Sequence, residues 1–166
     1  MAFQIPEGLH EDLYPLAWLI GTWSGSGKGE YEGIENFNFM HEVTFNHDGR
    51  KFLTYYSRSW LVDDNNEIIK PSASETGFWT INEGNKLEVM LAHSNGHAEG
   101  WLGVVDGARI QLAMDQAYSS PTAKVVEGGH RLYGLVEGDL FFAYDMAAQG
   151  KSLQPHIWST MARVNV

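Results

Sequence analysis

Apolar residues follow a helical period only near the start of the chain. Three- and four-residue spacing predicts one helix face at Leu13, Leu16, Ala17 and Ile20. Glu11 and Asp12 precede this face, and acidic residues suit the N-terminus of a helix because the backbone dipole favours negative charge there. The pattern ends at Gly21, so we expect a single short helix before that residue.

After Gly21 the chain consists of short segments rich in aromatic and β-branched residues, which are typical of strands. Turn signals separate these segments, at HDG 47–49, DDNN 63–66, EGN 83–85, NG 95–96, DG 106–107, EGG 127–129, EGD 137–139 and QGK 149–151. The intervals predict about ten strands. Connections this short cannot hold crossover helices, so consecutive strands must pair as antiparallel hairpins in an up-and-down meander.

Such a meander has unpaired edges unless the sheet closes, and closure into a barrel removes them. We therefore predict an all-β fold in which residues 1–166 form one domain, a ten-stranded antiparallel up-and-down barrel with the short N-terminal helix at one end. About eight strands leave an interior that side chains just fill, so a larger barrel should enclose a cavity. Alternation of apolar and polar residues indicates an inner face at Leu87, Val89 and Leu91. Residues 139–146 are apolar on both faces, so alternation does not assign their inner face. A two-sheet sandwich stays open as an alternative architecture.

Composition narrows the class of partner. The length of 166 residues suits one domain with one core. A net charge of −10 disfavours nucleic acids and anionic membranes, which bind proteins through Lys and Arg. The absence of cysteine excludes disulfides, thiolate metal sites and a cysteine nucleophile. The first residues lack the basic and apolar regions of a signal peptide, so we expect a cytoplasmic protein.

The stretch GTWSGSGKGEY has five odd-numbered residues that would share one face of a strand: Gly21, Trp23, Gly25, Gly27 and Gly29. Its glycines and lysine are similar to a phosphate-binding loop. The spacing fails, because such a loop needs Gly at position 22, which is Thr, and a hydroxyl residue at position 29, which is Gly. Two explanations remain for this bare face, on which the three glycines after Trp23 carry no side chains. The strand bends at a barrel corner, or a flat ligand or another backbone approaches it closely.

Histidines and a carboxylate offer other candidate chemistry. A two-residue turn at 95–96 would put His93 and His97 out of register, which disfavours a metal site there. His41 has the context of a solvated residue, beside a glutamate. Glu75 has aromatic neighbours that could bury it and raise its pKa, although a buried hydrogen-bond acceptor is the more frequent role.

His156 stands apart because it follows Pro155 on the last predicted strand, among apolar and hydroxyl residues. A lone histidine in such a place is most often a hydrogen-bonded core residue. Haem iron, however, needs only one protein nitrogen, since the porphyrin supplies its in-plane ligands. A single imidazole in an apolar cavity is therefore a coherent haem ligand, and spacing alone leaves both interpretations open.

Several segments together resemble the nitrobindin family. They occur in the family's order from about residue 16 to residue 164, as LAWLIGTWSGSGKGEY, FLTYYSRSW, ETGFW, AKVV, RLYGLVEGDL and LQPHIWSTMAR. The G-x-W-x-G-x-G signature and the C-terminal LQPH make the likeness specific. The resemblance implies a ten-stranded antiparallel barrel, similar in shape to fatty-acid-binding proteins, that holds one ferric haem b near its mouth.

The resemblance also implies residue roles and an activity. It makes His156 the axial ligand of the haem iron and the catalytic residue, brings Lys124 close to the haem, and places Met146 in the pocket wall. The signature strand is expected to contribute cofactor contacts from Gly21, Trp23, Gly25 and Gly27. Nitrobindins bind nitric oxide and isomerise peroxynitrite to nitrate, so the implied function is that of a haem-dependent peroxynitrite isomerase.

The sequence departs from the family's pattern at Gly33, Ala73 and Thr80, where nitrobindins commonly carry threonine, histidine and arginine. Polar contacts to the haem are therefore expected to differ. The alternative function is a haem-free barrel that carries an apolar small molecule such as a fatty acid. The oligomeric state is left open by the sequence, with a homodimer as one option.

Overall fold

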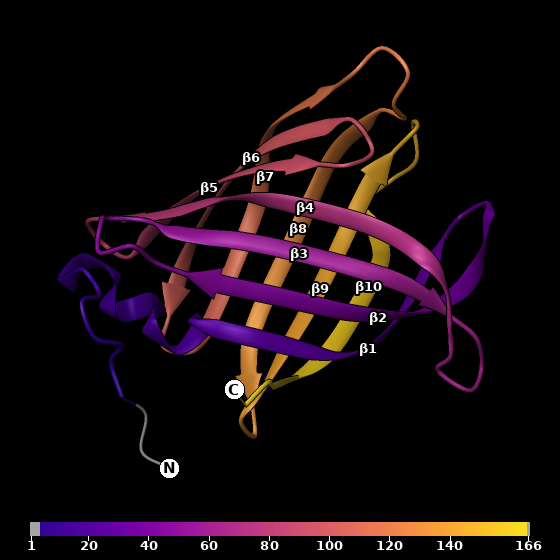
Figure 1. Cartoon of the computed structure of the whole chain (residues 1–166). Helices are drawn as coiled ribbons and strands as arrows, with labels where there is room; N and C mark the ends of the chain where they lie inside the picture. Colours follow the sequence, from indigo (N-terminus) through magenta and orange to yellow (C-terminus); the bar gives the residue numbers. More distant parts are fainter. Residues whose placement is uncertain (1–3, 166) are drawn as a thin grey trace.

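The computed structural model describes residues 4–165, in which ten strands form one closed antiparallel barrel (Figure 1). Each strand pairs with the next along the chain, and β1 closes the ring by pairing with β10. The elements are η1 Glu11–Leu19, β1 Gly21–Tyr31, β2 Ile34–Asn46, β3 Leu53–Val62, β4 Ile68–Asn82, β5 Lys86–His93, β6 His97–Asp106, β7 Arg109–Ser119, β8 Val126–Val136, β9 Asp139–Ala148 and β10 Gln154–Arg163. The predicted up-and-down barrel is confirmed, in place of the two-sheet alternative.

The predicted helix is confirmed as η1, a 3-10 helix at the end of the barrel where β1 begins (Figure 1). His10 caps its start, because the Nδ1 atom of His10 accepts a hydrogen bond from the backbone N–H of Asp12 at 3.1 Å. Pro15 lies inside the helix and lacks the N–H that a regular α-helical ladder needs. Its buried face is Leu13, Leu16, Ala17, Trp18 and Leu19. Within residues 4–165, no helix is long and apolar enough to cross a membrane.

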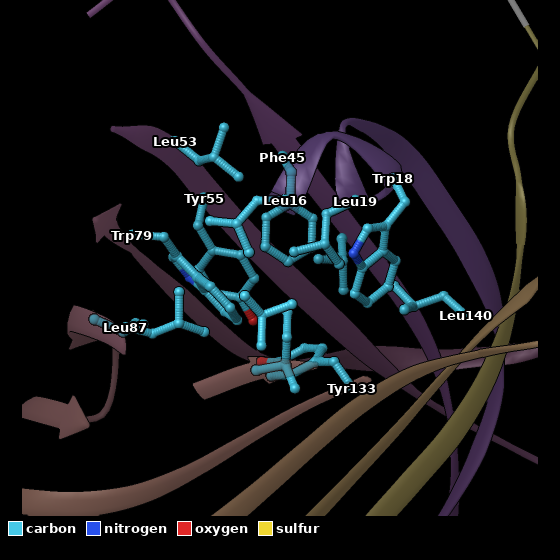
Figure 2. Packing of buried hydrophobic residues seen from close by; sticks show 14 of the residues in the cluster. Leu16, Trp18, Leu19, Phe45, Leu53, Tyr55, Trp79, Leu87, Tyr133 and Leu140 are labelled. Atoms are coloured by element: carbon cyan, nitrogen blue, oxygen red, sulfur yellow. The ribbon is translucent and has the colours of Figure 1, made fainter. Parts of the chain in front are cut away.

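Aromatic side chains fill the barrel next to η1. In Figure 2, leucines of the helix pack on Phe45, Tyr55 and Trp79, which come from β2, β3 and β4. The ring centroids of Phe45 and Trp79 lie 5.2 Å apart at 82°, and those of Trp79 and Tyr133 lie 5.2 Å apart at 78°. Edge-to-face pairs of this kind contribute about 0.5–1.5 kcal/mol each beyond the burial of area. Side chains therefore fill the barrel interior next to η1, and any internal cavity must lie toward the end of the barrel opposite this helix.

The glycines of β1 lie where β10 comes close. A Cβ atom on Gly25 would lie 2.0 Å from the carbonyl oxygen of Thr160, and one on Gly27 would lie 2.5 Å from the carbonyl oxygen of Trp158. The ring of Phe39 would also be only 2.6 Å from a Cβ on Gly27. The bare face is therefore filled by the protein's own backbone and a phenylalanine ring, which favours the close approach of another backbone over a ligand.

Candidate functional site

A cavity of about 140 Å³ lies inside the barrel, where β9 ends and β10 begins. Phe39, Phe142 and Ile157 supply apolar parts of its wall. Met146 and His156, which the family resemblance assigns to the pocket, also line it. Polar groups converge on the same space, including the histidines His41, His93, His97 and His156.

His156 is held in one tautomer by the neighbouring strand. Its Nδ1 atom lies 3.0 Å from the backbone carbonyl oxygen of Glu30 on β1. A carbonyl can only accept a hydrogen bond, so Nδ1 carries the proton and the lone pair remains on Nε2. Burial lowers the pKa of His156, against the smaller opposing effect of the bond to Glu30, so the ring is neutral near pH 7.

These properties of His156 fit the donor that haem iron requires. A metal-ligating histidine needs a neutral ring, and its other nitrogen usually donates to a carbonyl or carboxylate that fixes its orientation. Aromatic rings add packing on several sides, since the centroids of Tyr31, Phe37 and Tyr144 lie 5.5, 6.2 and 6.0 Å from that of His156. The structure thus supplies one oriented imidazole packed among aromatic rings.

A buried ion pair of Glu75 and Arg131 lies in the same wall. Arg131 donates from Nη1 to Oε1 of Glu75 at 2.6 Å and from Nη2 to Oε2 at 2.8 Å. The hydroxyl of Tyr55 donates to Oε1 of Glu75 at 2.6 Å. Burial alone raises the pKa of Glu75, but the charge and hydrogen bonds of Arg131 outweigh it and lower that pKa well below its usual range. The expected role of Glu75 as a hydrogen-bond acceptor is confirmed. The expected rise of its pKa is wrong, because the sequence does not show that Arg131, on a distant strand, pairs with this carboxylate.

The expected register of the 93–97 hairpin is also wrong. Ala92 pairs with Ala98, so the turn contains three residues and His93 faces His97 across the hairpin. The centroids of the two rings lie 6.2 Å apart. Both imidazoles therefore reach the cavity wall, although within residues 4–165 no group of three or more His, Asp or Glu residues is arranged to hold a metal ion.

Each of these two histidines has a different partner. The Nδ1 atom of His93 lies 3.1 Å from Oε2 of Glu75, and its Nε2 atom lies 2.5 Å from Oε1 of Glu99. The Nε2 atom of His97 donates to the backbone carbonyl of Lys124 in the β7–β8 loop. His93 is thus part of the ion cluster, while His97 fixes the backbone of the loop that carries Lys124.

His41 lies in the cavity wall, so its predicted solvated position is wrong. It is 4% exposed, and each ring nitrogen lies 2.8 Å from a serine hydroxyl, Nδ1 from Ser159 and Nε2 from Ser57. Burial lowers the pKa of His41 to about 4. Alternation along β2 was the missed signal, because Phe39 and Val43 are both buried and His41 shares their face.

The signature residues of β1 lie toward the η1 end and along the contact with β10. Trp23 is 1% exposed, and its Nε1 donates to the carbonyl of Leu19 at 2.9 Å. The guanidinium carbon of Arg163 lies 4.1 Å from the centroid of the Trp23 ring. In the part of the chain that the structure describes, the cavity wall is made by residues other than Gly21, Trp23, Gly25 and Gly27. Direct contacts of these residues with a cofactor stay a prediction.

The positions that depart from the family pattern fall in different places. Ala73 lines the cavity, so the absent histidine concerns the site itself. Thr80 is adjacent to buried Trp79 and therefore faces outward, where its hydroxyl donates to the carbonyl of Glu88 at 3.3 Å. Thr80 does not line the cavity, and its effect on haem contacts stays a prediction. Gly33 has a φ of 91° in the β1–β2 turn, a conformation that favours glycine.

Comparisons with known proteins agree with this geometry. The family model described as "THAP4-like, heme-binding beta-barrel domain" matches residues 12–163. A protein from Nocardioides sp. named peroxynitrite isomerase is 45% identical over 163 residues, which cover 98% of this chain and 99% of that protein. A ferric nitrobindin-like protein from Streptomyces griseus is 39% identical over 97% of this chain and 86% of its own length.

A solved structure has the same fold. The crystal structure of Rv2717c from M. tuberculosis superposes with a TM-score of 0.85 at 34% identity, covering 95% of this chain and 99% of that chain. The family match extends over nearly all of the barrel, from η1 to the end of β10. The chain therefore belongs to the nitrobindin family, the THAP4-like haem-binding β-barrel domains.

Proposed function

We propose that the protein binds one haem b through Nε2 of His156 and isomerises peroxynitrite to nitrate. The observation that carries this proposal is the bond from Nδ1 of His156 to the carbonyl of Glu30, which leaves a neutral donor nitrogen in the cavity wall. The activity is supported by the names of the relatives, of which several are called peroxynitrite isomerase.

The protein's own residues have three tasks in this function. When bound, ferric haem supplies an electron-accepting iron centre, which the protein does not otherwise possess. His156 would hold the iron through Nε2, and the carbonyl of Glu30 fixes the direction of the ring. Phe142 and Met146 keep the surroundings apolar and exclude water. Since peroxynitrite and nitrate contain the same atoms, the reaction needs no net proton from the chain.

Lys124 is proposed to act at the entrance. Its side chain is exposed, and His97 holds its backbone carbonyl. The protein has a net charge of −10, which opposes the approach of an anion. A positive side chain close to the entrance offsets this repulsion locally. Replacement of Lys124 with Met is expected to slow anion binding with little effect on haem affinity.

Haem uptake is tested by reconstitution. Wild-type protein should take up one equivalent of haem and show a Soret band, and His156→Ala should shift that band and weaken binding. His130→Ala is the matched control, because His130 is an exposed histidine on β8. Absence of stoichiometric uptake by the wild-type protein would overturn the proposal.

Catalysis is tested by stopped-flow measurement of peroxynitrite decay. The decay should be faster with ferric holo-protein than with apo-protein, and equal rates would reduce the function to haem binding.

The haem-free carrier function has less support. A fatty acid needs an enclosed apolar tunnel for its chain, whereas the interior beyond the cavity is filled by Phe45, Trp79 and Tyr133. Its carboxylate would meet Arg131, whose charge is already matched by Glu75. A haem that sits near the mouth, as the family resemblance implies, requires less of the interior. Displacement of a fluorescent fatty acid probe would distinguish the two ligands.

A further inference from the structure

His93 has a carboxylate oxygen next to each of its ring nitrogens. Nδ1 lies 3.1 Å from Oε2 of Glu75, and Nε2 lies 2.5 Å from Oε1 of Glu99. A neutral imidazole carries one N–H and one lone pair. In either neutral tautomer, the unprotonated ring nitrogen of His93 would point its lone pair at a carboxylate oxygen, which is repulsive. A further proton on that nitrogen removes the repulsion. With that further proton each of the two contacts contains one N–H, and the 2.5 Å contact between Nε2 of His93 and Glu99 is the shorter of the two.

The side chains around His93 shield this proton from water and stabilise the protonated form of the ring. The side chains of Glu99 and Arg131 are each 2% exposed, and that of His93 is 14% exposed. The indole Nε1 of Trp101 donates to Oε1 of Glu99 at 3.2 Å, which helps to hold that carboxylate in place. Buried charges are tolerated only when they are paired, so an unpaired second carboxylate would be costly here.

The charges that face His93 balance only when it is an imidazolium. Glu75 from β4 and Glu99 from β6 supply two negative charges, and Arg131 from β8 supplies one positive charge. His97 on β6 lies 6.2 Å away and is bonded to a backbone carbonyl, so it adds no carboxylate partner. With a proton on His93, two cations face two carboxylates. Without it, the cluster has one unmatched negative charge at the cavity wall.

We propose that His93 and Glu99 hold a proton inside the barrel, and that this proton keeps the cluster of Glu75, His93, Glu99 and Arg131 neutral so that a small anion can enter the site. The second part rests on the proposed function, because it concerns anions that reach a haem bound by His156. His93 then determines specificity for anions without contacting the iron. It shares the cavity wall with His156.

The size of the effect follows from the environment of the charge. In surroundings with an effective dielectric constant of about 20, an unmatched charge in the same cavity wall changes the affinity for a small anion by about tenfold or more. Removal of His93 should therefore weaken anion binding at neutral pH. Removal of both His93 and the charge of Glu99 should restore it, because the remaining Glu75 and Arg131 match each other.

The buried proton is tested first in haem-free protein, by nitrogen-15 NMR of the histidine rings at pH 7. Both ring nitrogens of His93 should show the shifts of protonated nitrogen in wild-type protein, and only one should do so in Glu99→Gln. The exposed ring of His130 serves as the internal reference and should not change. A singly protonated His93 ring in the wild type, with no change in Glu99→Gln, would overturn the first part.

Anion access is tested in ferric holo-protein with fluoride as the probe, by its effect on the Soret band at pH 7. His93→Gln should raise the Kd for fluoride about tenfold, and His93→Gln/Glu99→Gln should return it to within about threefold of the wild type. His130→Gln is the control for replacement of a histidine. Equal Kd values in wild type and His93→Gln would overturn the second part. Failure of the wild type to take up haem would reject the proposed function and this second part, while the NMR result would still decide the first.

Discussion

The Nδ1 atom of His156 on β10 lies 3.0 Å from the carbonyl oxygen of Glu30 on β1. The backbone pairing of these two strands ends at Gly29 with Ile157, just before this contact. Pro155 precedes His156 and has no N–H to continue the ladder. The carbonyl of Glu30 is therefore available to a side chain, and the imidazole takes the place of a backbone donor.

Haem binding should persist below the pH at which an ordinary histidine becomes charged. Burial lowers the pKa of His156, so its neutral, ligating form is retained as the pH falls below 6.5. The Soret band of reconstituted protein, measured between pH 5 and 8, should lose half its intensity only below pH 6.5. Half-loss at a higher pH would show that Nδ1 is not held as the structure describes.

The glycine at position 25 should be needed for stability. A Cβ atom there would lie 2.0 Å from the carbonyl oxygen of Thr160, so Gly25→Ala must push β1 and β10 apart. We expect a loss of about 1–3 kcal/mol or more in the free energy of unfolding, measured by urea denaturation. Gly100→Ala is the matched control, since a Cβ atom on this strand glycine would meet nothing within 4 Å. Equal stability of the two variants would contradict the close approach.

Loss of the buried guanidinium should be far more costly than loss of an exposed one. Arg131→Met leaves Glu75 without its main partner, and we expect a cost of about 3–5 kcal/mol in the free energy of unfolding. Arg58→Met removes an exposed pair with Glu42 and should cost no more than about 1 kcal/mol. Chemical denaturation of both variants provides the comparison. Similar costs would mean that the interior pair is screened by water.

Stability should fall as the pH decreases, and His41 should account for part of the fall. Its pKa is about 4 in the folded protein and about 6.5 when unfolded, so the unfolded chain binds a proton that the folded chain does not. Between pH 8 and 5 this difference should remove about 2 kcal/mol from the free energy of unfolding. The contribution of Glu75, whose folded pKa is also lowered, begins only below its ordinary value of 4.5.

The test for His41 is the slope of stability against pH. His41→Gln should have a shallower slope than wild type between pH 8 and 5, whatever its stability at pH 8. The pKa of His156 is lowered as well and adds a fall of the same sign to both proteins, so the comparison isolates His41. Identical slopes would mean that His41 is accessible to protons in the folded state.

Turn signals and strand composition were sufficient to predict the barrel, because hairpin connections are local and leave only one way to remove the sheet edges. The same local logic identified the inner face of β5 at Leu87, Val89 and Leu91. It failed at the 93–97 turn, where one additional residue changed the register and turned two histidines toward each other. Turn length is set by a balance of small energies that sequence patterns do not resolve.

By itself, the sequence determined the strand order, the closure of the barrel and, through family motifs, the choice of His156. The tertiary structure alone decided which polar groups share the interior. Glu75, Arg131 and Glu99 come from three strands that are far apart in the chain, and their pairing depends on the positions of those strands around the barrel. Burial then sets the charge states, because a carboxylate or imidazole responds to the groups within a few ångströms of it and not to its neighbours in sequence.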